Sequence, residues 1–391
     1  MTFAGAARPG CYYNQRVFAL DPGGDSFMPL NHLNEAEQAP RAVDQSKRGL
    51  IKSAAGVLVA TSVGALSARQ ASAASPAAAS SVWGDPSTLV TTLGAGTLAA
   101  KSVAETVEAY SKGFGYVEHF RGRIPKEMAE FWGAPAMAGR DVSVMGPPGY
   151  NRGMIRIVEL GNDFKEIPYH ETLGWTALEI HVRSPEEVVE QLKGHNFIHT
   201  GGPGTAKDNE GNAFYRAAQF KGPSGEPLYM TQHMQLDQLM SVGRNNVGAL
   251  FIQTLTVTSY PETLDFYVNT LKMKMRIEIQ TPRANLVKAL NLPSDARYRM
   301  AAVRAPEFSA LQIDEYPKAV PKRPASPGCF APGVNICTFT TRDIDVVKTA
   351  LRGAKVQFAE IESNGCPPFA FGRAVCFVGR GGERLEIVEV K

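Results

Sequence analysis

Apolar residues recur along the chain in two kinds of short run that alternate after residue 88. Four strand-like runs, rich in apolar and β-branched residues, are each followed by a run with helical spacing of its apolar positions. The four pairs are 89–98 with 102–112, 175–182 with 185–193, 250–258 with 261–271, and 334–341 with 343–352. Further alternating segments follow each helix-like run. Short helices separated by several strands predict an α+β fold in which each helix lies on one face of a sheet.

The same pattern contains an internal repeat. SVAETVEAY at 102–110 matches SYPETLDFY at 259–267, and FYRAAQFKGPSGEPLYM at 214–230 matches FGRAVCFVGRGGERLEI at 371–387. Both matches have one offset, 157 residues (102 to 259, and 214 to 371). Two matches at one spacing predict a tandem duplication, and each half divides again into two strand–helix–strand units.

Four such units resemble the vicinal oxygen chelate superfamily, which includes glyoxalases, bleomycin-resistance proteins and extradiol dioxygenases. The resemblance is carried by SYPETLDFYVNTLKMK at 259–274, GWTALEIHVRSPEEVVEQLK at 174–193, and the GxxGExL hairpins that close the repeats. It implies an α+β fold of four βαβββ modules paired into two glyoxalase-like domains. In chain order, these domains are expected at 88–240 and 241–391.

The N-terminal segment has a different composition. Ser46, Lys47 and Arg48 precede a mildly apolar stretch at 50–66 and then Ala71-Ser72-Ala73, which is the order of an export signal. It is similar to a twin-arginine (Tat) signal, with Lys47 in place of the first arginine. We therefore expect a leader at 1–45, a signal segment at 46–74, a linker at 75–87, and a periplasmic or secreted protein. An Ala-rich leader without a sorting role is the alternative.

Overall composition narrows the choice of partner. The 391 residues contain 41 Lys+Arg and 38 Asp+Glu, a net charge of +3, which argues against nucleic-acid binding. No run of about 18 uninterrupted apolar residues exists, so no membrane association is expected after signal removal. The expected partner is a small molecule, and two domains in one chain are compatible with a monomer.

The resemblance implies a divalent metal held by the first and last strands of the modules. Alignment on the helices and hairpins places these positions at Ala95, Ala177, Ile252 and Ile336, and at Arg156, Tyr229, Gln312 and Glu386. Glu386 is the one strong ligand, with Gln312 a weak second, so no cofactor is expected. The alternative is a metal-dependent dioxygenase or glyoxalase-like lyase that uses Glu386 and Gln312 to hold Fe, Mn, Zn or Ni.

Alternation along 175–182 places Glu179 and His181 on the same face as Ala177, the aligned cup position, and Tyr229 and Arg156 are expected to join them. The predicted roles are Glu179 or His181 as base, Tyr229 as acid, and Arg156 as the group that holds an anionic oxygen. This predicts metal-independent isomerase, lyase or cyclase chemistry on a small apolar or aromatic molecule. The alternatives are a buried salt-bridge network, with Arg156 paired to Glu179, and a non-catalytic protein that binds or sequesters its ligand.

Overall fold

The structure is a computed structural model that describes residues 87–207, 213–234, 246–282, 284–307, 309–317, 320–362 and 372–390. The expected leader, the signal segment and all but the last residue of the linker lie outside these residues. So does the expected boundary between residues 240 and 241. None of the helices among the described residues is long and apolar enough to cross a membrane.

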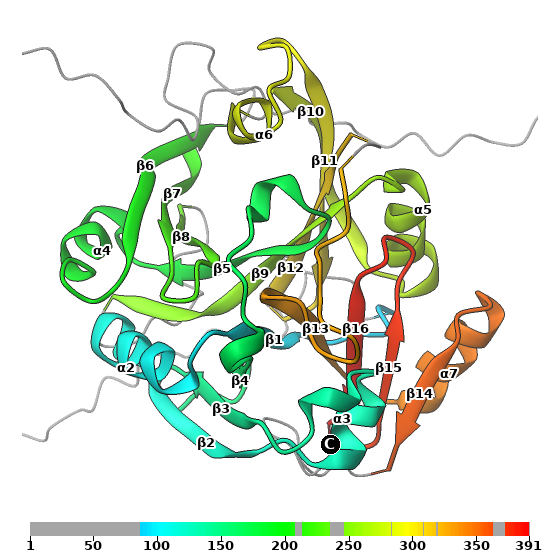
Figure 1. Cartoon of the computed structure of the whole chain (residues 1–391). Coiled ribbons are helices and arrows are strands. Elements are labelled where there is room, and N and C mark those ends of the chain that lie inside the picture. The colour runs from blue at the N-terminus through cyan, green and yellow to red at the C-terminus, as the bar shows by residue number, and fades with distance from the viewer. Residues whose placement is uncertain are drawn as a thin grey trace, which may run out of the picture.

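Within the described ranges, sixteen strands form two eight-stranded mixed sheets (Figure 1). The first sheet, in the order β14-β15-β16-β13-β1-β4-β3-β2, contains β1 (Leu93–Ala100), β2 (Val117–Arg123), β3 (Asp141–Gly146), β4 (Met154–Glu159), β13 (Gly333–Thr341), β14 (Phe358–Ile361), β15 (Ala374–Val378) and β16 (Arg384–Glu389). The second, in the order β10-β11-β12-β9-β5-β8-β7-β6, contains β5 (Gly174–Val182), β6 (Ile198–Lys207), β7 (Ala213–Lys221), β8 (Pro227–His233), β9 (Val247–Val257), β10 (Lys274–Pro282), β11 (Arg297–Ala305) and β12 (Ser309–Glu315).

One helix follows the first strand of each module. These helices are α2 (Val103–Phe114), α4 (Pro185–Gln191), α5 (Tyr260–Asp265), which a π-helical turn (Phe266–Thr270) extends, and α7 (Ile344–Gly353). Local sequence fixes three of their starts, because the side chains of Ser102, Ser184 and Asp343 accept hydrogen bonds from backbone N–H groups in the first turn. Two short helices, α3 (Lys126–Phe131) and α6 (Ala284–Ala289), are insertions. The four βαβββ modules predicted from the sequence are therefore confirmed.

The pairing of the modules differs from the order along the chain. β1 pairs antiparallel with β13, so the first and fourth modules share the first sheet, while β5 pairs with β9 and joins the second to the third. Pairing in chain order, first with second and third with fourth, was expected. The repeat shows which modules are alike but carries no information about which first strands hydrogen-bond.

The residues kept between the repeats connect the two sheets. Tyr110 of α2 donates a hydrogen bond to Glu226, just before β8, over 2.7 Å, and Tyr267 donates to Glu383 over 2.8 Å. A Cβ on Gly222 would lie 2.1 Å from the Glu226 carboxylate, so only glycine leaves room for it. A Cβ on the equivalent glycine of the other repeat would lie just as close to the Glu383 carboxylate. The first module is thus bonded to the second, and the third to the fourth.

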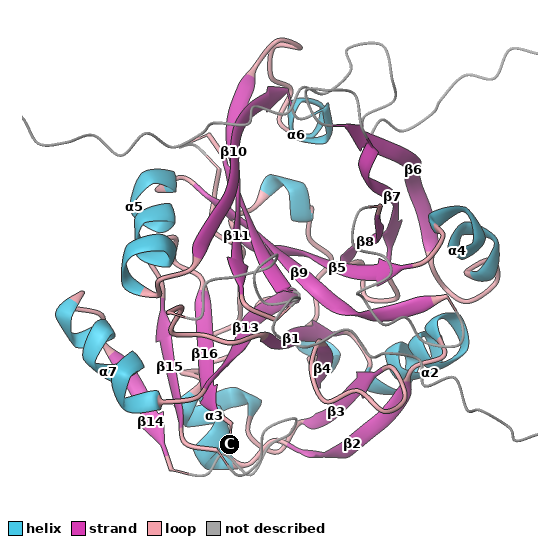
Figure 2. Cartoon of the chain, turned by 180° about the vertical axis from the view of Figure 1, so that it is seen from behind, coloured by secondary structure: helices cyan, strands magenta, loops and turns pink. Residues whose placement is uncertain are grey.

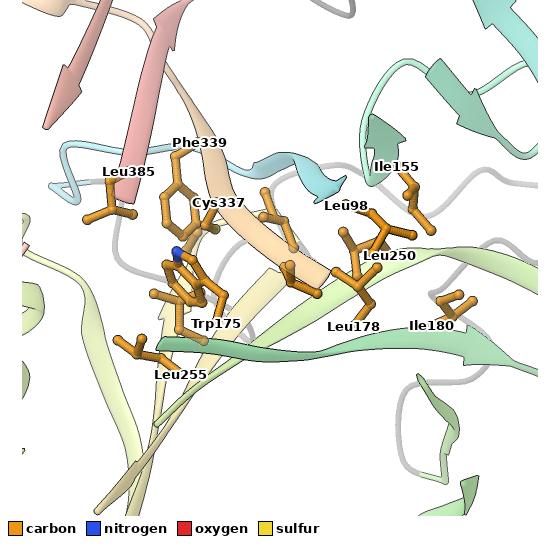
Figure 3. Packing of buried hydrophobic residues seen from close by; sticks show 14 of the residues in the cluster. Leu98, Ile155, Trp175, Leu178, Ile180, Leu250, Leu255, Cys337, Phe339 and Leu385 are labelled. Carbon is orange, nitrogen blue, oxygen red and sulfur yellow. The ribbon is translucent and has the colours of Figure 1, made fainter. Parts of the chain in front are cut away.

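The two sheets pack against each other through one face each, which we call the inner faces. Trp175, Leu178 and Leu250 of the second sheet meet Leu98 and Phe339 of the first in one buried cluster (Figure 3). The main helices complete the same cluster, with α2 beside α4 on one flank and α5 and α7 on the other (Figure 2). The opposite, outer faces carry the alternate residues of the same strands. The positions relevant to chemistry lie on these outer faces.

Candidate functional site

The outer face of the first sheet is covered by the protein's own chain. The insertion between β2 and β3, which contains α3, packs Met128, Phe131 and Trp132 against this face. The sheet residues that they meet include Ile336 and Val388. Burial of large apolar side chains here stabilises the fold and fills the space that a ligand would need.

Beneath that insertion lies a buried ion pair. Arg156 donates from Nη2 to Glu386 Oε2 over 2.6 Å, and both side chains are at most 1% exposed. Thr338 Oγ1 donates to the same carboxylate oxygen over 2.6 Å, and Arg156 Nε donates to Thr97 Oγ1 over 3.0 Å. The guanidinium also lies over the ring of Trp132, 4.5 Å from its centroid. Every charged group of this cluster is therefore compensated within the chain.

Arg156 consequently has a different position from the one predicted. It pairs with Glu386 rather than Glu179, and it lies in the first sheet, whereas Glu179, His181 and Tyr229 lie in the second. The cause is the pairing of the modules, because β4 is bonded to β1 in the sheet that also holds β16. Arg156 cannot hold an anionic oxygen beside Glu179.

The sequence resemblance implies metal positions on the first and last strands, and the strand register shows which residues lie there. The first-strand residues that lie beside the expected last-strand positions each come two residues after the predicted Ala95, Ala177, Ile252 and Ile336, on the same face of the strand. Beside the last strands, Thr97 is next to Arg156, Thr338 to Glu386, Glu179 to Tyr229, and Thr254 to Gln312.

These residues do not fit a divalent metal. In the first sheet, the guanidinium of Arg156 lies against Glu386 where the cation would be. At the four positions of the second sheet, the one carboxylate is that of Glu179, and the other three groups are a phenol, a hydroxyl and an amide. Glu386 and Gln312 lie in different sheets, so they cannot share an ion as the metal-dependent alternative requires. Within the part of the chain that the structure describes, no three His, Cys, Asp or Glu side chains are grouped to hold one.

The outer face of the second sheet is polar. Glu179 and His181 of β5 lie beside Tyr229 and Thr231 of β8 in register, as the alternation predicted. Gln312 of β12 donates from Nε2 to Asp314 over 3.1 Å on the same face. Other polar side chains on this face come from β7, β8, β10 and β11, and they are Tyr215, Gln219, His233, Arg276 and Arg304.

This sheet curls so that β10, at one edge, and β7, near the other, face each other across the polar face (Figure 1). Arg276 of the edge strand β10 donates from Nη1 to the hydroxyl of Tyr215, on β7 near the opposite edge, over 2.6 Å. Its Nη1 lies 3.3 Å from His233 Nε2. The rings of Tyr215 and His233 meet edge to face, with centroids 4.8 Å apart. Side chains from both ends of the sheet therefore form one cluster.

Burial sets the protonation states in this cluster. It raises the pKa of Glu179 to about 7, and the charge of Asp314 contributes. Burial also lowers the pKa of His233 to about 3, with Arg276 and Arg304 adding to the effect. At neutral pH, Glu179 is divided between its acid and carboxylate forms, while His233 is a neutral imidazole. A carboxyl group with this pKa can accept and return a proton near pH 7.

Sequence reasoning missed four members of the cluster: Tyr215, His233, Arg276 and Arg304. Alternation along β8, from Tyr229 through Thr231, would have placed His233 beside them. Arg276 has no such signal, because it is the extra residue of a bulge between Met275 and Ile277. The alternation of side chains between the two faces of a strand is interrupted at a bulge.

Comparison with solved structures supports this fold. Glyoxalase I from Zea mays superposes with a TM-score of 0.52 at 15% identity, over 76% of this chain and 92% of that one. A dioxygenase candidate from Bacillus subtilis superposes with a TM-score of 0.53 at 12% identity, over 77% of this chain and 86% of that one. No family model and no curated protein matches the sequence. The chain has the vicinal oxygen chelate fold.

Proposed function

We propose that this protein is an acid–base enzyme that acts on a small organic molecule at the outer face of the second sheet. The observation that carries the proposal is Glu179, a buried carboxyl whose pKa of about 7 suits proton transfer at neutral pH. It lies beside the phenol of Tyr229 in register and two residues before His181 on β5, on a face to which arginines also contribute. Groups of these types in one buried site can move a proton and stabilise the charge that forms.

The proposed roles follow from the placement of each group. Glu179 removes a proton from carbon or oxygen, and Tyr229, beside it in register, returns one to the other end of the reacting bond system. His181, two residues along β5, is the second candidate for the base. Arg276 and Arg304, rather than Arg156, supply the positive charge on this face. Isomerisation, elimination and cyclisation all need this set and no change of oxidation state.

Sequestration of a ligand without turnover remains the competing function on the same face. It needs complementary shape and charge but no group that titrates near pH 7. The two functions therefore differ in what they require of Glu179, and substitution of this residue separates them.

The test is proton exchange with solvent. Purified protein in D₂O is incubated with aromatic and carbonyl compounds that carry acidic C–H bonds, and deuterium incorporation is followed by NMR. We expect catalysed exchange to rise with pH through an apparent pKa of about 7 and to fall at least about 100-fold in Glu179→Gln, because the amide cannot accept the proton. Glu187→Gln, which changes an exposed glutamate on α4, is the matched control. Equal exchange in both variants would refute the role of Glu179.

We also propose that the chain is exported, on the strength of the basic pair and the apolar stretch before Ala71-Ser72-Ala73. Replacement of Lys47 and Arg48 by Gln should retain the protein in the cytoplasm of an expressing bacterium, as measured by cell fractionation. Replacement of Arg41 and Arg69 by Gln, with the same loss of charge outside the basic segment, is the control. Export that survives loss of the basic pair would contradict the proposal.

A further inference from the structure

We infer that the ligand of the second sheet's outer face carries an anionic oxygen group, which binds between Arg276 and Arg304. The inference depends on the proposed function only for the choice of this face. It adds the substrate class, a small organic acid or its equivalent oxyanion, and it assigns the residues that recognise the charge.

The first step is how the two arginines come together. Register pairs Lys274 with Arg304, Met275 with Val303 and Ile277 with Ala302, so Arg276 has no opposite residue on β11. A bulge turns its residue away from the regular alternation and re-aims the side chain. Here it directs the guanidinium across the face to Tyr215 on β7. Arg304 reaches the same face by ordinary alternation, since its partner on β12 is Ala310.

The second step is the charge that this places on the face. Arg304 is half-buried, and this burial together with the nearby charge of Arg276 lowers the pKa of Arg304 to about 10. Two guanidinium groups that repel one another are a cost to the folded protein. His233, which contacts Arg276, is kept neutral and adds no third charge. An anion bound between the arginines would replace this repulsion with two attractions.

The third step is geometry. A guanidinium presents paired N–H donors that match the two oxygens of a carboxylate or the oxygens of a phosphate group. The ring of Tyr215 lies under Arg276, with the guanidinium 5.3 Å from its centroid, which restricts the orientation of that fork. Burial raises the pKa of the Tyr215 hydroxyl, with the charge of Glu179 adding to the shift, so this phenol stays protonated at neutral pH. An anion at the arginines would thus leave the remainder of the ligand near Glu179.

The experiment is calorimetric titration of the full chain at pH 7.5 with benzoate and, separately, with inorganic phosphate. We expect at least one of the two to bind, and Arg304→Gln and Arg276→Gln each to weaken it at least 10-fold. Arg297→Gln is the matched control, because Arg297 is an exposed arginine on the opposite face of the same strand, β11. The affinity of this variant for the anion should stay within twofold of the wild-type value. Stronger binding of benzoate identifies a carboxylate ligand, and stronger binding of phosphate identifies a phosphorylated one.

Thermal unfolding excludes the trivial explanation that the variants do not fold. Removal of one of two repelling, half-buried charges should leave the Tm of Arg304→Gln equal to or above that of wild type. The bound anion should raise the Tm of wild type and of Arg297→Gln more than that of Arg304→Gln. Failure of both anions to bind, or equal weakening in Arg297→Gln and Arg304→Gln, would overturn the inference. Glu179→Gln separates the inferred anion site from the proposed function. If this variant still binds the anion and its proton exchange is undiminished, Glu179 is not the base, but the arginine site is unaffected.

Discussion

At the scale of single residues, the two outer faces show how one fold treats equivalent positions in opposite ways. In the first sheet, Arg156 and Glu386 neutralise each other under a covering of apolar side chains. In the second, Tyr229 and Gln312 occupy the equivalent last-strand positions, and Glu179 lies beside Tyr229, without such a covering from α3. A buried ion pair is costly to form and costly to break, so it specifies which groups must stay together.

Breaking that pair gives the first prediction. Arg156→Met leaves the Glu386 carboxylate buried without its cation and should lower the free energy of unfolding by about 3–5 kcal/mol. Adding Glu386→Leu should recover most of the loss, because no charge is then left unpaired. Urea unfolding measures both effects. Lys112→Met, which breaks an exposed pair with Glu108, should cost less than about 1 kcal/mol.

The same variants test whether the first sheet takes part in the chemistry. Proton exchange by the Arg156→Met and Glu386→Leu double variant should match that of wild type once both are folded, because the pair lies in the other sheet from Glu179. Loss of exchange in the folded double variant would mean that Arg156 or Glu386 takes part in the reaction.

At the scale of elements, the contacts that connect the sheets explain what the repeat preserves. Helix α2 and the β7–β8 hairpin meet through Tyr110 and Glu226, and the equivalent elements of the other half meet through Tyr267 and Glu383. The backbone N–H of Ser224 also donates to Glu226, over 2.9 Å. Sequence identity at these positions therefore reflects a structural requirement between elements rather than a catalytic one.

These two contacts predict how stability depends on pH. Burial raises the pKa of Glu226 and of Glu383 from the ordinary value of 4.5 to about 7. Because the folded state holds these protons more tightly than the unfolded state, their contribution is complete below pH 4.5 and is lost as pH rises to about 7. The loss is about 3 kcal/mol at most for each group. Urea unfolding from pH 5 to 8 should show stability falling in wild type.

Glutamine variants isolate the contribution of each carboxyl group. In Glu226→Gln, the decrease between pH 5 and 8 should be smaller than in wild type, and in the double variant with Glu383→Gln smaller again, because an amide does not titrate. Glu187→Gln should leave the wild-type dependence unchanged. A dependence that is the same in all four proteins would place the titrating groups elsewhere.

At the scale of the whole molecule, local pattern and global arrangement differ in how far the sequence predicts them. Helix starts at Ser102, Ser184 and Asp343 follow from short-range capping, and the repeat reveals the modules. The sharing of a sheet by β1 and β13 depends on hydrogen bonds between residues about 240 positions apart, and alternation does not encode it. The same limit accounts for the site: Glu179 and Tyr229 belong to one module and were placed together correctly, whereas Arg156 was assigned to the wrong sheet.

This interleaved pairing predicts the behaviour of the chain when it is divided. A chain that ends at residue 240 keeps β1 and β5 but loses β13 and β9, the strands that pair with them. Each first strand would then expose an unpaired edge and the apolar residues of its inner face, so neither 88–240 nor 241–391 should fold alone.

Co-expression of the two halves as separate chains should restore the fold, because every lost partner is then supplied by the other fragment. We expect one tagged half to co-purify the other as a one-to-one complex on size exclusion, with the circular dichroism of the intact chain. Two independently folded, non-associating halves would instead mean that the modules pair in chain order. Arg156 and Glu179 would then belong to one domain, and proton exchange by the 88–240 half alone would be the decisive measurement.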